Sequence, residues 1–279
     1  WLGLVGSEMC IRDRYMTQRE DQQYFDVVEI YGGKAEVTQI SIRRNLRCGK
    51  NFDVCAGIDL TDETQVRSLF KYLQKHRVHT VIMAPPCTHL GGWSHLNRYK
   101  SKDRTLFDYN VKVAQRLGEL AAGIALFQLR AGRHFLCENP LASTLWQQPG
   151  WKQVSLNSHV VSAHCHPCRQ GLTTTDGQPI LKPTLFVASH PMLVKRLATL
   201  CAKDDFDNYP HDHRTISGKH VCDPVALWPR KLCNNIVDGI IELIAHERRQ
   251  QRVGDVGALG SLVSLSLIHI SEPTRPSQI

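Results

Sequence analysis

The chain has 279 residues, of which 42% are hydrophobic and 22% charged, with a formal net charge of +8 and a pI near 9.0. This length suits one α/β domain with an appendage, and there is no internal repeat or low-complexity run. The basic balance fits a polyanionic partner such as a nucleic acid. Ten cysteines without a secretory signal indicate an intracellular, reducing compartment rather than secretion. No stretch suits a membrane span.

The two ends of the chain are related at the nucleotide level. One choice of codons for Leu265–Arg275 gives, on the complementary strand and one base out of frame, the residues Leu4–Asp13. Both ends therefore resemble translated sequencing-library adaptor, which is set aside before the fold is considered. We expect residues 1–14 to be an adaptor-like artefact and residues 251–279 to be a disordered tail that carries another.

The first strand is predicted at Asp26–Ile30, directly before Tyr31-Gly32-Gly33. Glycines at the end of a strand let the backbone approach a ligand closely. Glu29 precedes the turn and is a candidate acceptor for an amino or hydroxyl group of a cofactor. A helix is predicted next, over Ala35–Leu46.

A strand-like run is predicted at residues 52–60, and Asp59 lies near its end. A helix then starts near Thr61-Asp62, with Thr61 as its N-cap. Asp59 has two interpretations, a ligand-binding carboxylate at the edge of the sheet or a helix-capping residue.

A short apolar run predicts a buried strand at Thr80–Met83. The strand ends at Ala84-Pro85-Pro86, because proline supplies no N–H group to a ladder. Cys87 follows on this stiff turn, at the sheet edge where α/β proteins bind ligands. We interpret it as a nucleophile rather than an ordinary buried cysteine. The basic loop over residues 95–102 suits either phosphate contact or plain solvation.

The longest helical pattern covers Phe107–Arg130, and another buried strand is predicted at His134–Pro140. Glu138 lies in that strand, where a carboxylate is costly to bury unless it is paired or protonated. Strands that alternate with helices in this order predict a Rossmann-like, doubly wound, mostly parallel α/β sheet. One edge of this sheet should collect the glycine turn, Cys87 and Glu138.

Two motifs, Pro85-Pro86-Cys87 and Glu138-Asn139-Pro140, resemble those of the DNA cytosine-5 methyltransferases, a family of class I S-adenosylmethionine-dependent enzymes. Residues 25–245 look similar to methyltransferase-like domains of retroelement polyproteins. Asp59 matches the Asp-Ile turn with which the family contacts the cofactor adenine. Residues 29–33 resemble a degenerate form of its first glycine motif.

The resemblance implies a cofactor, a partner and the residues that bind each. S-adenosylmethionine would be bound by Glu29, Tyr31, Gly32, Gly33, Asp59 and Pro85. Nucleic acid, with DNA favoured, would be bound by Ser94, Asn97, Arg98, Asn139 and Lys182.

The resemblance also implies a reaction. The thiolate of Cys87 would add to carbon 6 of cytosine and make carbon 5 nucleophilic, while Glu138 would support the charge near ring nitrogen 3. In a duplex the target base would have to be flipped out of the stack. Two alternatives stay open. One is an RNA cytosine methyltransferase that uses the same residues, and the other is a catalytically silent nucleic-acid-binding domain of a mobile-element polyprotein.

Two regions are expected between the ends. Residues 15–150 would form the S-adenosylmethionine-binding catalytic domain, and residues 151–250 a target-recognition region that completes the fold. Strands are predicted at Val154–Ser162 and within Pro179–Ser189, and a helix at Ile236–Ile244.

The last part of the chain departs from the family's pattern. Gln178 and Lys182 lie near the place of an arginine motif that orients the base, and that motif is not cleanly present. Asn234 and Asn235 stand, by position only, where the family has a Gly-Asn-Ser motif.

Cysteines and histidines are frequent between residues 165 and 222. They are Cys165, Cys168, Cys201, His211, His213, His220 and Cys222. The first two cysteines with His211 and His213 form a candidate tetrahedral zinc set, and Cys201 is a further candidate ligand. The gap between the pairs is longer than in compact zinc fingers, so the alternative is a small reduced region with solvated histidines.

Overall fold

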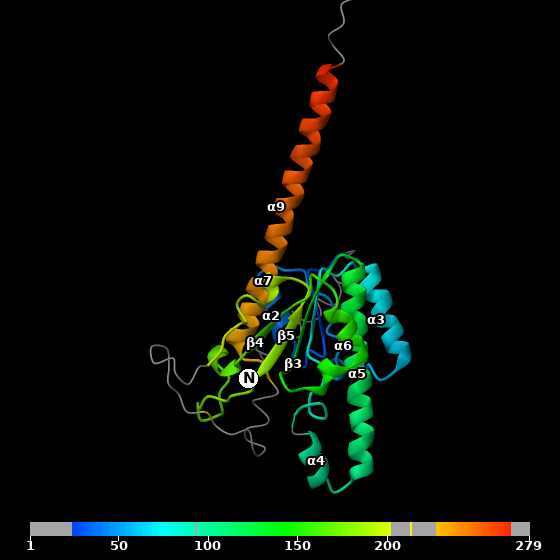
Figure 1. Cartoon of the computed structure of the whole chain (residues 1–279), viewed down its shortest axis with the longest axis vertical. Coiled ribbons are helices and arrows are strands. Elements are labelled where there is room, and N and C mark those ends of the chain that lie inside the picture. The colour runs from blue at the N-terminus through cyan, green and yellow to red at the C-terminus, as the bar shows by residue number, and fades with distance from the viewer. Residues whose placement is uncertain (1–23, 93, 202–212, 214–226, 269–279) are drawn as a thin grey trace, which may run out of the picture. The chain divides into compact units, whose positions relative to one another are not determined.

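The computed structural model describes residues 24–92, 94–201, 213 and 227–268 (Figure 1). The chain divides into two compact units, Trp1–Gly239 and Ile240–Ile279. The first unit contains the sheet and both sequence motifs. The second begins within helix α9 (Arg230–Ile268).

A five-stranded sheet organises the first unit. Its strands are β1 (Val27–Ile30), β2 (Thr80–Met83), β3 (His134–Pro140), β4 (Val161–Cys165) and β5 (Thr184–Ala188). They lie in the order β1-β2-β3-β5-β4. The first three are mutually parallel, and β5 runs antiparallel to both of its neighbours. The mostly parallel α/β sheet that we expected is confirmed, as are the predicted bounds of β2 and β3.

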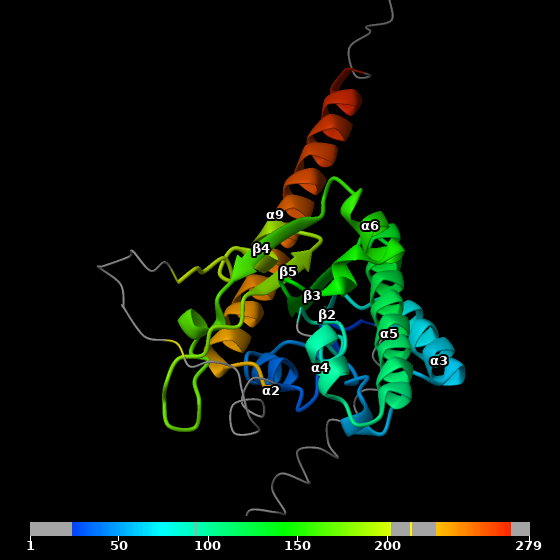
Figure 2. The ribbon, with the colours of Figure 1, turned by 60° about the horizontal axis from the view of Figure 1, so that its bottom comes forward.

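Helices cover both faces of this sheet (Figures 1 and 2). On one face lie α3 (Glu63–Lys75), α5 (Arg104–Arg130) and α6 (Pro149–Ser155); on the other lie α2 (Glu36–Arg43), α7 (Pro191–Val194) and the first turns of α9. Arg44, which ends α2, bonds Asp238 of α9 at 2.9 Å, so these two helices share a face. The sheet is therefore doubly wound.

The main core lies on the α3/α5/α6 face. Alternate residues of the parallel strands, such as Val81, Met83 and Phe135, point into it and are fully buried. Trp151 of α6 fills its far side and donates from Nε1 to the carbonyl of Gly118 at 3.0 Å. Burial of each large apolar side chain contributes about 1.5–3 kcal/mol, so this face is a major source of the protein's stability.

The prediction of a strand at residues 52–60 is wrong. Only Phe52 bridges to β1, through Ile30, and Val54–Ala56 forms a short 3-10 helix, η1. The carboxylate of Asp53 accepts from the amide of Cys55 at 2.8 Å, and Gly57 then adopts φ 77°. Such a local turn competes with ladder pairing, which explains the failure.

Two further elements differ from expectation. The basic stretch predicted as a loop contains helix α4 (Ser94–Lys100), which has no buried residue. The strand predicted over Val154–Ser162 is displaced, because Pro149 starts helix α6 and β4 begins only at Val161. Short 3-10 turns, η2 (Thr144–Gln147) and η3 (Pro167–Gln170), complete the fold.

Helix α9 is longer than predicted. It continues to Ile268, beyond the expected end at Ile244 and into the segment that we expected to be disordered from residue 251. The nucleotide-level repeat that suggested a tail says nothing about conformation, and no proline interrupts residues 230–268. Within the described part of the chain, no helix combines the length and apolarity needed to cross a bilayer.

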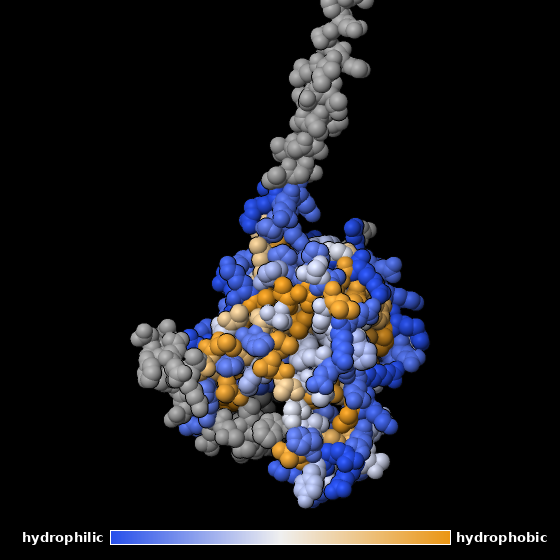
Figure 3. Space-filling view, viewed as in Figure 1, coloured by the Kyte–Doolittle hydropathy of each residue, from blue (hydrophilic) through white to orange (hydrophobic). Residues whose placement is uncertain are grey.

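Surface character differs between the elements. On the face seen in Figure 3, hydrophobic atoms gather over β4 and β5, whereas α3 and α5 expose mainly hydrophilic ones. The exposed surface of α3 is charged, as the ion pair between Glu63 and Arg116 of α5 illustrates.

The turn after β1 gives a test of this fold. A Cβ atom added at Gly32 would lie 2.8 Å from both the Cβ of Glu29 and the Oδ1 of Asn51, whereas one added at Gly33 would meet nothing within 4 Å. We expect Gly32→Ala to destabilise the protein by about 2 kcal/mol through overpacking. Gly33→Ala should cost only about 1 kcal/mol, for its left-handed φ of 50°. Urea unfolding of both variants checks this, and equal losses would contradict it.

Candidate active site

Cys87 lies on a fixed turn at the carboxyl end of β2. The amide of Ala84 donates to the carbonyl of Ile30 at 3.2 Å, so the ladder with β1 extends one residue beyond the strand. The carbonyl of Cys87 then accepts from the amides of Leu90 and Gly91, at 3.1 and 2.9 Å. The thiol is partly buried, on a backbone that has little freedom.

Glu138 lies within the neighbouring strand, β3, and its side chain is buried. Its Oε2 atom accepts from Nε1 of Trp228 at 3.3 Å, and its Oε1 atom lies 3.8 Å from Nζ of Lys182. A buried carboxylate must be paired, and these two contacts supply the pairing. Lys182, proposed from the sequence as a substrate residue, is thus the counter-ion of Glu138.

The thiol of Cys87 is close enough to both charges for each to shift its pKa. Burial raises the pKa of Cys87, the positive charge of Lys182 opposes that rise, and the negative charge of Glu138 adds to it. Burial lowers the pKa of Lys182, but the charges of Glu138 and Cys87 outweigh burial and leave it above its ordinary value. Cys87, Glu138 and Lys182 therefore form one electrostatic unit.

Asn139 joins the two motifs directly. Its Nδ2 atom donates to the carbonyl of Pro85 at 2.8 Å, across the β2–β3 pair. The side chain is fully buried, and among the described residues its Oδ1 atom has no hydrogen-bond partner. Asn139, expected to bind substrate, and Pro85, expected to bind cofactor, thus hold the cysteine turn against β3.

A small pocket adjoins the carboxylate. It is lined by Glu138, Pro167, Leu172, Lys182, Thr184, Leu227, Trp228, Pro229 and Leu232. This lining is mostly apolar, with one acid and one base. Cys87 does not line it, so the pocket gives access to Glu138 and Lys182 but does not itself place a ligand against the thiol.

The turn after β1 has an unusual backbone. Tyr31, Gly33 and Ala35 adopt left-handed φ values of 59°, 50° and 56°. For the two non-glycine residues this conformation costs roughly 1–2 kcal/mol each. Tyr31 is fixed by its hydroxyl, which donates to the carbonyl of Leu117 at 3.2 Å, and burial raises its pKa. Strain of this kind is often kept where a backbone must present itself to a ligand.

Two residues that the sequence did not single out hold this turn. Oδ2 of Asp53 accepts from the amide of Gly33 at 3.0 Å, and Nδ2 of Asn51 donates to the Gly33 carbonyl at 3.0 Å. Both belong to a segment that bridges to β1 in parallel on the side opposite β2. In the sequence, the one indication that Asp53 lies at the sheet was the apolar Phe52 directly before it.

Glu29, expected to bind the cofactor, is used inside the protein. Its Oε2 atom accepts from the amide of Thr38 in α2 at 2.6 Å, and its side chain is almost fully buried. Burial raises its pKa to about 7, against the hydrogen bonds to Thr38, which lower it. Glu29 therefore satisfies the start of helix α2 rather than facing a ligand.

Asp59 is fully exposed and makes a local turn. It accepts from the amide and the hydroxyl of Thr61, at 2.9 and 2.7 Å, and these bonds lower its pKa. The N-cap of α3 is Asp62, which accepts from the amide of Thr64, and not Thr61 as we expected. Asp53, rather than Asp59, lies beside the glycine turn.

The remaining predicted substrate residues lie on α4. Ser94 donates to the carbonyl of His89 at 2.8 Å, and Asn97 is exposed. Arg98 makes a two-pronged ion pair with Asp108 of α5, at 2.6 and 2.7 Å. That pair already engages the guanidinium that we expected to contact phosphate.

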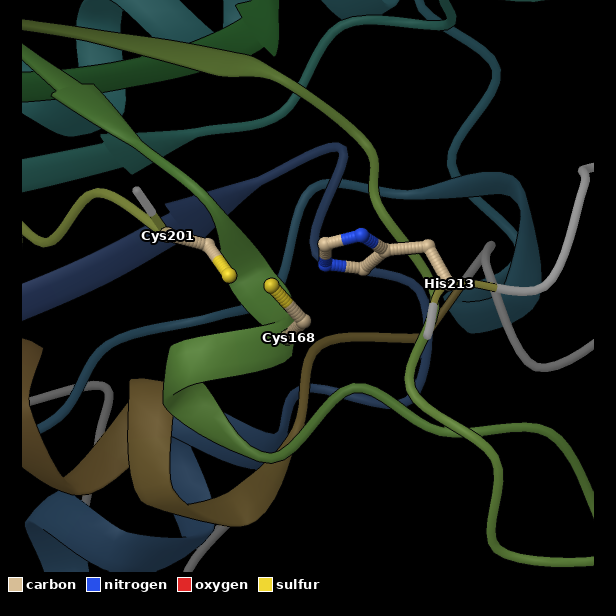
Figure 4. Close-up of side chains that lie close together, drawn as sticks. All are labelled: Cys168, Cys201 and His213. Carbon is tan, nitrogen blue, oxygen red and sulfur yellow. The ribbon is translucent and has the colours of Figure 1, made fainter. Parts of the chain in front are cut away.

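The candidate metal ligands are only partly brought together. Atoms of Cys168, Cys201 and His213 lie within 4.8 Å of one another, and their side chains point toward a common centre (Figure 4). Cys165, a predicted ligand, is instead buried with its thiol 3.7 Å from Oγ1 of Thr199. His211 lies outside the described residues, as do His220 and Cys222.

No family model and no curated protein matches the chain. Among solved structures, it is similar to the Dnmt2 methyltransferase of S. pombe, with 11% sequence identity and a TM-score of 0.33. The match covers 58% of this chain and 48% of that one, so the chain spans about half the length of that structure. We therefore interpret the site from its own geometry.

The electrostatic unit around Cys87 predicts opposite effects of two substitutions. Lys182→Met removes the charge that lowers the pKa of the thiol, so alkylation of Cys87 by iodoacetamide should slow several-fold at pH 8. Glu138→Gln removes the charge that raises it, so alkylation should accelerate. Peptide mass spectrometry can follow Cys87, with the exposed Cys55 as internal reference. A change of the same sign in both variants would show that the three groups do not interact.

The raised pKa of Glu29 implies that the free energy of unfolding depends on pH. Its pKa is raised from 4.5 to about 7 in the folded state, so its stabilising contribution is complete below pH 4.5 and is lost as the pH rises through 7. Glu29→Gln should abolish that loss, which amounts to a few kcal/mol at most. Urea unfolding between these pH values measures it. Glu63→Gln, an exposed acid on α3, serves as control. A wild-type slope that persists in Glu29→Gln would refute the assignment.

Proposed function

We propose that the chain transfers a methyl group from S-adenosylmethionine to carbon 5 of cytosine in DNA. The observation that carries this proposal is the placement of Cys87 on the turn that follows β2 and of Glu138 within the adjacent parallel strand β3, with Lys182 acting on both. A thiol beside a paired, buried carboxyl group suits addition to an electron-poor heterocycle, because the thiolate attacks while the protonated carboxyl group donates to the ring nitrogen where negative charge develops.

Each residue of this unit has a distinct task. The thiolate of Cys87 attacks carbon 6 of the base, and Lys182 favours that thiolate against the effect of burial. Glu138, as a carboxylic acid, donates its proton toward ring nitrogen 3 of the base, and Trp228 and Lys182 keep its carboxyl group oriented. Transfer of the methyl group to carbon 5 would leave S-adenosylhomocysteine. Carbon 5 then loses its proton to solvent, and the carbon 5–carbon 6 double bond re-forms as the bond from carbon 6 to the sulfur of Cys87 breaks. Asn139 acts indirectly, through its bond to Pro85.

The cofactor would be held at the point of the sheet where the order in which the chain adds its strands reverses. After β1 the chain first adds the bridging segment around Phe52 on one side, and later adds β2 on the other. In open α/β sheets, ligands bind outside the carboxyl ends of the strands at such a switch point. Tyr31, Gly32 and Gly33 lie on one side of this point and Pro85 on the other.

The residues at the switch point fit a nucleoside-containing cofactor in part. Gly32 leaves no room for a Cβ, so the turn is packed as closely as the backbone allows. The carboxylate of Asp53 accepts hydrogen bonds from the amides of Gly33 and Cys55. A carboxylate has further acceptor positions, which a hydroxyl group of the cofactor could use. S-adenosylmethionine would supply an electrophilic methyl group there. Glu29 is not available for this role.

DNA is the proposed partner because the chain is basic. Its formal net charge is +8, and exposed basic residues such as Lys100 lie on α4, in the segment that follows the cysteine turn. The partly buried thiol would meet only a base that has left its stack, so base flipping is part of the proposal.

One observation favours a second candidate, a catalytically silent nucleic-acid-binding domain. The carboxylate of Glu29 and the amide of Gly33 both have intramolecular partners, which leaves fewer polar groups for a cofactor. Such a domain would bind DNA through charge alone and would not bind S-adenosylmethionine.

A covalent trapping experiment decides between the two. The full chain is incubated with S-adenosylmethionine and duplex DNA that carries 5-fluorocytosine, whose fluorine blocks release of the enzyme. We expect an adduct that survives denaturing electrophoresis, is lost in Cys87→Ser and persists in Cys55→Ser. Adduct on 5-fluorocytosine RNA alone would move the substrate to RNA. DNA binding without adduct or cofactor binding would establish the silent domain instead.

A further inference from the structure

A cluster of two thiols and one imidazole lies apart from the proposed catalytic unit. Cys168 belongs to the 3-10 turn η3, Cys201 lies in the loop after helix α7, and His213 comes later in the chain. Their ligand atoms lie within 4.8 Å of one another (Figure 4). In a tetrahedral zinc site, Zn–S and Zn–N bonds of the usual length place ligand atoms roughly 3.5–3.8 Å apart. Small side-chain adjustments would therefore bring the three to binding distance.

The backbone around the two cysteines is held by a network of hydrogen bonds. The amide of Cys201 donates to Nδ1 of His166 at 2.9 Å, and the amide of His166 donates to the carbonyl of Thr199 at 2.7 Å. The Gln170 side chain bonds Oγ1 of Thr199 at 2.9 Å and receives a bond from Asn235 at 2.7 Å. These contacts fix the segment of Cys168 against that of Cys201 before any ligand binds, which lowers the entropic cost of binding one.

We propose that Cys168, Cys201 and His213 bind a zinc ion. Two thiolates and an imidazole are a ligand set that favours zinc over magnesium or calcium, which prefer oxygen. On binding, the two thiols lose their protons to solvent and one nitrogen of the neutral imidazole coordinates. The three side chains leave one corner of a tetrahedron for a fourth ligand.

The ion would have a structural task. It would tie together the segments of Cys168, Cys201 and His213, and neither cysteine forms a disulfide. Pro167, directly before Cys168, lines the pocket that also contains Glu138 and Lys182. Zinc would therefore fix one wall of that pocket. This site differs from the set suggested by sequence spacing, because the thiol of Cys165 is turned to Thr199.

Metal analysis of the full chain tests the proposal. The protein is purified under reducing conditions without chelator, and zinc is measured by inductively coupled plasma mass spectrometry. We expect about one zinc ion per chain in the wild type, and a loss to background in Cys168→Ser, Cys201→Ser and His213→Ala. Cys55→Ser and His164→Ala replace an exposed cysteine and an exposed histidine elsewhere and should keep the metal.

A second readout covers variants that fold poorly. Wild-type protein stripped of metal and loaded with cobalt(II) should show a thiolate-to-cobalt charge-transfer band and the intense visible bands of a tetrahedral ion. Zinc should then displace the cobalt and remove these bands. A chelator should lower the melting temperature of the wild type but not that of Cys168→Ser. Absence of both metal and cobalt bands in reduced protein overturns the proposal, as does a Cys168–Cys201 disulfide in freshly purified protein.

Discussion

The parallel pairing of β2 with β3 is the constraint on which the candidate site depends. Its register sets Met83 opposite Cys137, so both strands end at the same edge of the sheet. The bond from Asn139 to the Pro85 carbonyl then joins the two strand ends. A slip of one residue between β2 and β3 would reverse the faces of these strands relative to each other and separate the Cys87 turn from Glu138. The pairing of β3 with β5 in turn places Lys182 beside Glu138, so the two registers together bring the thiol and the carboxylate into one environment.

Two carboxylates in this sheet show two ways in which the free-energy cost of burying an acidic side chain is offset. Glu138 has a lysine and an indole N–H as partners. Glu29 has backbone amide partners at the start of α2, and burial outweighs them, so its pKa rises to about 7. A buried acid whose side-chain partners lie at a pocket can act on a ligand, whereas one bonded only to a helix start is mainly a structural element. The same residue type at two strand ends thus has two tasks.

The sequence predicted those parts of the fold that rest on local patterns. Strands β2 and β3 were found with correct bounds because apolar runs stopped by proline leave little choice. The strand at residues 52–60 and the bounds of β4 were predicted wrongly because apolar patterns were weighed above local signals, namely the turn that Asp53 makes with Cys55 and the helix start at Pro149. In the site, the sequence singled out Lys182 but not Trp228, because only the contact of each with Glu138 relates the two. Asp53 was missed for the same reason, since only its bond to Gly33 distinguishes it from Asp59.

The partners of Glu138 come late in the chain, and this affects the order in which the protein can mature during synthesis. Strands β1, β2 and β3 emerge from the ribosome first, and at that stage β3 has an open edge. Its neighbour β5 follows about fifty residues later, and Trp228 later still. Until then the carboxylate can remain hydrated, because nothing has yet closed over it. The thiol of Cys87 is made well before its environment is complete, so a nascent chain would carry Cys87 in a state unlike that of the finished protein.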